Sequence, residues 1–150
     1  MLVELYRRYA GDYPKFFKMD TLSRLGFVAA EILLKELSGI SRQPSAVILA
    51  NRSASIKNDR DYLATISEGN YYPSPSLFVY TLPNIVTGEI AIRHHIQGET
   101  AFYILEQPEQ LEPILRSTLH KQHSTTALAG WCECSEPDRF YAKIQIIWNN

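Results

Sequence analysis

The sequence has few cysteines, no long apolar run and no excess of charge of one sign. Two cysteines occur among 150 residues, so a framework of disulfides is not expected. No window reaches the roughly 18 consecutive apolar residues of a membrane-spanning helix. The first residues also lack a basic stretch followed by an apolar run. We therefore expect a cytoplasmic protein with no leader and no membrane span.

Basic and acidic residues balance, with 15 Lys and Arg against 16 Asp and Glu. This balance does not favour nucleic acid or an anionic membrane as a partner. Cys132 and Cys134 have a C-x-C spacing that places both thiols on one face of a strand. His120 and His123 have helical spacing, but no further ligand completes a four-ligand zinc site. We therefore expect no metal and no cofactor, and thiols that serve only as small packing residues.

The hydrophobic pattern predicts helices alternating with strands. Apolar residues at three- and four-residue steps predict a helix over Thr21–Leu37, with Asp20 or Thr21 as its N-cap and Gly39 as its stop. The apolar run Ala46–Ala50 predicts a strand buried on both faces. The other expected elements are helices over 59–67, 81–94 and 108–121, a loop over 51–58, and strands over 100–105, 126–134 and 140–148.

The chain is expected to end in a hairpin. Ser135–Asp138 is a turn-forming segment between two strands of alternating polarity, which predicts antiparallel pairing. Helices that alternate with strands before the hairpin predict a mostly parallel sheet. The expected fold class is therefore α/β, with one domain over residues 1–150. Its mixed, mostly parallel sheet has helices packed on it and a C-terminal antiparallel hairpin.

The middle of the chain carries the clearest motif. Pro83-Asn84 opens a helix, Gly88 follows four residues after the Asn, and Gly98-Glu99-Thr100 leads into a strand. This order resembles the β-ketoacyl synthase segment that leads to the catalytic nucleophile. Ala46–Asn51 and Leu128–Glu133 resemble two further strands of that family and fall in the expected order. The resemblance implies a thiolase-like half-fold, equivalent to the N-terminal half of a ketosynthase.

The resemblance places the family's nucleophile where this chain has no cysteine. Counting from Gly98, the position falls on Gln107, between Glu106 and Glu109. Condensation needs a thiolate at a helix N-terminus, together with two histidines or a His and an Asn. The family's histidines belong to its C-terminal half. The resemblance therefore implies a protein that does not catalyse condensation by itself. Chain-length factors and decarboxylating loading domains also carry Gln at this position, so a decarboxylase stays open.

Four residues are candidates for contact with a substrate or partner, namely Asn51, Arg52, Asn84 and Gln107. In the family, the strand before the nucleophile pairs with its two-fold mate. The resemblance therefore implies a dimer interface at the matching strand, through Thr100, Phe102, Tyr103 and Ile104.

The expected function is that of a ketosynthase-like accessory or scaffold protein in fatty-acid or polyketide-type biosynthesis. Its expected partner is a second copy or a full-length ketosynthase, and an acyl carrier protein is a further candidate. A small acyltransferase or decarboxylase acting on carrier-bound acyl thioesters is the alternative. A stand-alone ligand-binding α/β domain is a third interpretation.

Overall fold

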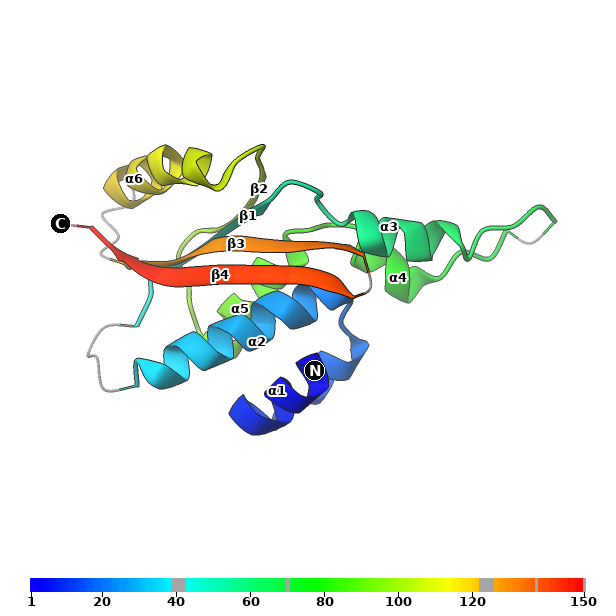
Figure 1. Cartoon of the computed structure of the whole chain (residues 1–150), viewed down its shortest axis with the longest axis horizontal. Coiled ribbons are helices and arrows are strands. Elements are labelled where there is room, and N and C mark those ends of the chain that lie inside the picture. The colour runs from blue at the N-terminus through cyan, green and yellow to red at the C-terminus, as the bar shows by residue number, and fades with distance from the viewer. Residues whose placement is uncertain (39–42, 70, 122–125, 137, 150) are drawn as a thin grey trace.

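The computed structural model describes residues 1–38, 43–69, 71–121, 126–136 and 138–149. Its helices are α1 (Leu2–Tyr9), the 3-10 helix η1 (Pro14–Lys18), α2 (Thr21–Glu36), α3 (Ile56–Leu63), α4 (Pro75–Val79), α5 (Ile85–His94), the 3-10 helix η2 (Pro108–Gln110) and α6 (Leu111–Lys121). Its strands are β1 (Ala46–Asn51), β2 (Thr100–Ile104), β3 (Thr126–Glu136) and β4 (Arg139–Trp148). Across these described ranges the strands form one sheet in the order β2-β1-β3-β4 (Figure 1).

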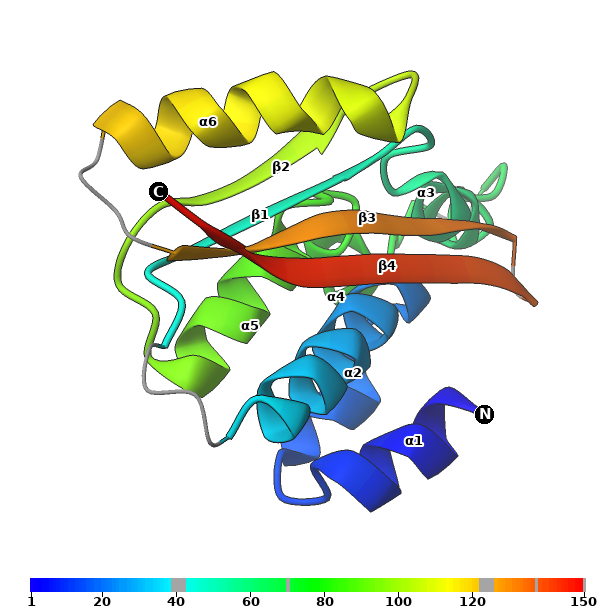
Figure 2. The same ribbon diagram turned by 60° about the vertical axis from the view of Figure 1, so that its left-hand side comes forward.

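The sheet is mixed, as the sequence predicts. β1 pairs in parallel with β2 and with β3, and β3 pairs antiparallel with β4. The predicted C-terminal hairpin is therefore confirmed, although Pro137 of its turn lies outside the described residues. Figure 2 shows three layers, with α2 and α5 on one face of the sheet and α6 on the other. In this arrangement α5 contacts β1 and β2, while α2 contacts β3 and β4.

The central strand β1 is buried over its whole length because helices cover both of its faces. Val47 and Leu49 pack into the core on the side of α2 and α5, whereas Ile48 and Ala50 pack toward α6. Each fully buried aliphatic side chain of this kind contributes roughly 1.5–3 kcal/mol to stability. The long apolar run in the sequence thus has a physical cause, since neither face of β1 meets water.

The strand β4 has one covered face and one exposed face. Alternate side chains pack into the core beneath the sheet, namely Phe140, Ala142, Ile144 and Ile146. The residues between them are exposed, namely Tyr141, Lys143 and Gln145. This period of two is typical of a strand covered on one side only.

The helix α2 begins as expected. The Asp20 carboxylate accepts a hydrogen bond from the Ser23 backbone N–H at 3.0 Å, which makes Asp20 the N-cap. The predicted stop, Gly39, lies outside the described residues.

The predicted start of α5 at Thr81 is wrong, because the helix begins at Ile85. The Thr81 hydroxyl instead donates to the Phe78 carbonyl at 2.7 Å, and so belongs to the end of α4. Pro83 disfavours the helical conformation at the residue before it, which separates the two helices.

The predicted helix over 59–67 is wrong in its bounds. α3 covers Ile56–Leu63 and so begins inside the segment expected to be a loop. The Ser55 hydroxyl lies 2.9 Å from Asp59 Oδ1 and 2.7 Å from the Thr81 carbonyl, and these contacts anchor the first turn. The helices α1, η1 and α4 were not predicted. Two of them, η1 and α4, have only five residues each, which is too few to show a helical period.

Candidate functional site

The loop after β1 is held by Asn51. This side chain is fully buried, and its Nδ2 donates to the Ala54 carbonyl at 2.9 Å. Its Oδ1 accepts from the Ala54 backbone N–H at 2.8 Å, and Ala54 has a φ of 52°. An alanine in this left-handed conformation carries strain that local hydrogen bonds must offset. Asn51 therefore shapes the end of the strand, and both of its amide atoms are engaged within the loop.

The carboxyl ends of β1, β2 and β3 bring Arg52, Glu106 and Glu133 together. Glu133 accepts hydrogen bonds from the Arg52 backbone N–H, at 2.9 Å, and from the Ser53 hydroxyl. The Arg52 guanidinium lies 3.3 Å from Glu106 Oε2, and both side chains are exposed. In α/β sheets this edge is where ligands commonly bind, at the point where the strand order reverses. Here Ser53 donates to a carboxylate with no histidine between them, which is not the arrangement of an activated nucleophile.

Gln107 begins the helical segment that leads into α6. Its backbone N–H donates to Gln110 Oε1 at 2.9 Å, and its side chain accepts from the Gln110 backbone. These two bonds form a capping box, which satisfies N–H groups at the start of a helix. The Gln107 side chain thus serves as an N-cap in this structure.

The two cysteines lie far along the chain from this helix start, in β3. Both are free and buried, and Cys132 Sγ lies 3.7 Å from the position that a Cβ at Gly26 of α2 would occupy. Burial, followed by the nearby Glu133, raises the pKa of Cys132 to about 12. Burial, followed by Asp20, raises the pKa of Cys134 to about 11. Such thiols stay neutral at physiological pH and act as packing residues.

Asn84 is exposed and directly precedes α5. Its carbonyl accepts from the Thr87 hydroxyl at 2.8 Å and from the Gly88 N–H at 3.3 Å. Among the described residues, no hydrogen bond or ion pair joins Asn84 to Asn51 or to Gln107. Of the four candidates, Asn51 and Arg52 have side chains at the carboxyl edge, where Asn51 bonds Ala54 and Arg52 pairs with Glu106.

β2 is an edge strand of the sheet. The Val47 N–H donates to the Glu99 carbonyl, and the Leu105 N–H donates to the Asn51 carbonyl, each at 2.9 Å. Because backbone direction alternates along a strand, residues 99, 101, 103 and 105 face β1. The N–H and C=O groups of Thr100, Phe102 and Ile104 therefore point outward along the free edge.

The side chains of the expected interface do not all point outward along the edge as the backbone groups do. Phe102 packs into the core beneath the sheet, and Tyr103 packs into the core beneath α6. Ile104 is 51% exposed, and Thr100 is also exposed. Gly98 permits the turn before β2, since a Cβ there would lie 1.9 Å from the Ser45 carbonyl oxygen. The edge thus presents backbone rather than aromatic side chains.

A network of charges that the sequence analysis did not identify lies beneath the sheet. Glu31 on α2 is 7% exposed, and its carboxylate lies 2.9 Å from both Arg93 Nε and His94 Nε2. Burial raises the pKa of Glu31, but the contacts with His94 and Arg93 outweigh it and leave the pKa below its usual value. Glu31 and Arg93 are 62 residues apart in the sequence, so no local pattern reveals the network. It fastens α5 to α2.

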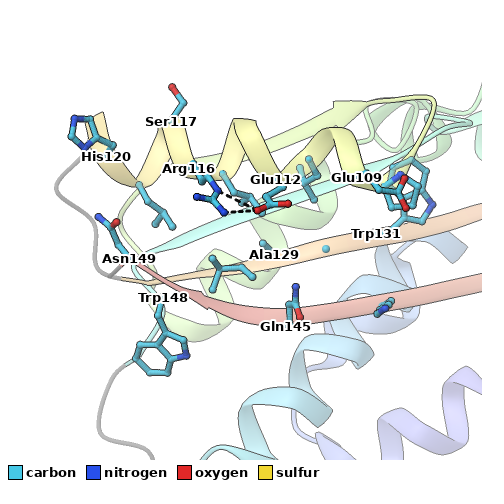
Figure 3. Close-up of a pocket in the computed structure, with 17 residues that line it drawn as sticks. Glu109, Glu112, Arg116, Ser117, His120, Ala129, Trp131, Gln145, Trp148 and Asn149 are labelled. Carbon is cyan, nitrogen blue, oxygen red and sulfur yellow. Dashed lines mark hydrogen bonds and ion pairs between the residues drawn. The ribbon is translucent and has the colours of Figure 1, made fainter.

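A groove of about 970 Å³ lies between α6 and the face of β3 and β4 that is turned toward this helix. Figure 3 shows Gln145 pointing into it from β4, with the ion pair of Arg116 and Glu112 above. Trp131 of β3 forms part of its floor, whereas the indole of Trp148 lies on the opposite side of β4 (Figure 3). The described residues contain no cluster of three or more His, Cys, Asp or Glu placed to hold a metal. No helix in the described ranges has the length and hydropathy to cross a bilayer.

Comparison with known proteins finds similarity in structure only. No family model matches the sequence, and no curated protein matches it. The structure is similar to the ishigamide ketosynthase/chain length factor, with 22% identity over 85% of this chain and a TM-score of 0.71. It is also similar to a ketosynthase in complex with its chain length factor from Xenorhabdus doucetiae, with 18% identity over 85% of this chain and a TM-score of 0.64.

The chain spans 37% and 52% of the length of these two matched chains. The similarity therefore concerns part of their fold. It confirms the predicted resemblance. The mixed sheet and the terminal hairpin of this chain agree with the predicted fold class. This protein has a ketosynthase-like half-fold of the thiolase-like type.

Proposed function

We propose that this chain is an accessory subunit that pairs with a ketosynthase through the outer edge of β2 and does not itself catalyse condensation. The observation that carries the proposal is the free edge, along which the backbone groups of Thr100, Phe102 and Ile104 point outward. An exposed edge of this kind is a template for pairing with another strand. One of the similar structures is itself a ketosynthase in complex with a chain length factor.

The chemistry of the residues supports the accessory role. Gln107 occupies a helix start as a capping residue, and the buried thiols of Cys132 and Cys134 have raised pKa values. A condensing nucleophile needs the opposite environment, with an accessible thiol whose pKa is lowered by a helix N-terminus. The described part of the chain offers no such thiol. The contribution to biosynthesis would then be structural.

The proposal is tested by native mass spectrometry of the chain with each full-length ketosynthase encoded in the same genome. We expect a one-to-one complex with one of them. Ile104→Pro should abolish it, because proline removes an outward N–H without removing a hydrogen bond to β1. Ile104→Thr keeps the N–H and the branched side chain, and should retain the complex.

Three results would overturn the proposal. One is a complex that survives Ile104→Pro unchanged, and another is no complex at about ten micromolar of each protein. The third is loss of carbon dioxide from malonyl-loaded carrier protein incubated with the chain alone, which would identify a decarboxylase.

A further inference from the structure

The outer side of α5 carries two apolar positions that the described chain leaves open. Gly88 and Ile92 follow one another at a four-residue step, opposite the fully buried Ile90. Ile85, one turn before Gly88, instead packs against the core cluster of Tyr6 and Phe16. Ile92 is 62% exposed. A Cβ at Gly88 would meet no atom within 4 Å, so the helix backbone is bare there. We call Gly88 and Ile92 the Gly88 face.

The position of α5 relates this face to the free edge. Figure 2 shows α5 beneath β1 and β2, while α2 lies beneath β3 and β4. Of the described helices on this face of the sheet, α5 is therefore the one nearest the edge of β2. Whatever pairs with β2 brings its own flanking structure next to α5.

Ordinary sheet geometry gives the distance between α5 and the corresponding helix of a partner that pairs with β2. Neighbouring strands lie about 4.8 Å apart, so a helix centred between β1 and β2 sits about 2.4 Å inside β2. A two-fold axis through a new antiparallel strand pair would lie about 2.4 Å outside β2. Two helices related by this axis are then about 10 Å apart and on the same face of the joined sheet. That separation falls at the usual helix packing distance of about 8–10 Å.

We infer that the Gly88 face is the helix-to-helix part of the ketosynthase interface, packing antiparallel against the partner's corresponding edge helix. This inference rests on the proposed function. A specific interface buries roughly 800 Å² on each partner, which the edge of a strand about 17 Å long does not supply alone. The bare backbone at Gly88 lets the two helices approach closely, and Ile92 gains an apolar contact. Asn84, four residues before Gly88, lies on the same side and can reach the partner.

The test measures the Kd for the ketosynthase by isothermal titration and the Tm of each free variant. Gly88→Leu fills the bare position and should weaken binding at least about 30-fold, because a large side chain separates the helices. It should not lower the Tm, since no atom of the chain occupies that space. Ser117→Leu is the matched control, with the same side chain on exposed α6 across the sheet. This control should bind as the unaltered chain does.

The outcomes separate this inference from the proposed function. If the unaltered chain binds and Ile104→Pro abolishes binding, but Gly88→Leu binds normally, the helix contact is overturned and the strand pairing stands. If Ser117→Leu weakens binding and Gly88→Leu does not, the partner sits on the opposite face of the sheet and the inference is wrong. If no ketosynthase binds the unaltered chain, both proposals fall.

Discussion

At the scale of single residues, the two thiols of this chain do not lie where a condensing enzyme needs its thiolate. The thiols of Cys132 and Cys134 lie in the core, where burial raises the pKa of each. Gln107 stands at a helix start, where a thiolate would be stabilised, and caps the helix instead. Both thiols therefore lie in an environment that keeps them protonated and unreactive.

The raised thiol pKa values predict a loss of stability in alkali. An ordinary thiol titrates near pH 9, so the unfolded chain releases these protons while the folded chain retains them up to about pH 11 or 12. The free energy of unfolding should fall as the pH rises through this range, by up to about 1.4 kcal/mol per pH unit for each thiol. Urea unfolding between about pH 8 and pH 10 measures the slope.

The control for this prediction is Cys132→Ala, which removes one titrating group. Burial also raises the pKa of Tyr13 and Tyr80, and these residues add a slope of the same sign in both proteins. Only the difference between the two slopes therefore reports the thiol. Equal slopes for the variant and the unaltered chain would contradict the assignment of Cys132 as a deeply buried neutral thiol.

At the scale of elements, local patterns predicted β1 and α2 well, because burial on fixed faces imposes a period on the sequence. They predicted α5 less well. The helix begins at Ile85, after Pro83, and the expected first residue Thr81 belongs to the end of the preceding helix. Contacts between distant residues left no local trace. Glu31 with His94 is one such contact, and Ser53 with Glu133 is another, 80 residues apart. The sequence named candidate residues for the site, such as Asn51 and Arg52. It did not predict which of them are in contact, because those contacts depend on how distant segments pack in the fold.

The packing of α2 against α5 predicts opposite effects for alanine at two helical glycines. A Cβ at Gly26 would lie 2.4 Å from Val86 Cγ2, so Gly26→Ala forces the two helices apart. We expect a net loss of about 1–2 kcal/mol, since overpacking outweighs the gain in helix propensity. Gly88→Ala meets open space and should add about 0.5–1 kcal/mol. Urea unfolding of both variants checks the signs, and a stabilised Gly26→Ala would contradict the close approach of α2 and α5.

At the scale of the whole molecule, the sheet has two edges of different character. β4 is ten residues long and carries Arg139 and Lys143, and charges on an edge oppose pairing with another strand. β2 is five residues long and uncharged, with the sequence TAFYI. Its flanking helix α5 adds the apolar Gly88 face on one side. Both properties favour the β2 edge over the β4 edge as the place where a partner extends the sheet.

If a ketosynthase binds as proposed, this difference between the edges predicts where hydrogen exchange slows. The outward N–H groups of Thr100, Phe102 and Ile104 should gain protection, because pairing removes them from water. Peptides that cover α5 and β2, residues 85–105, should therefore exchange more slowly in the complex, and β4 peptides should be unchanged. With Ile104→Pro, the added protection should disappear at equal protein concentration. Slower exchange along Arg139–Trp148 instead would place the partner at the opposite edge. The charges on β4 would then contact the partner and would not oppose strand pairing.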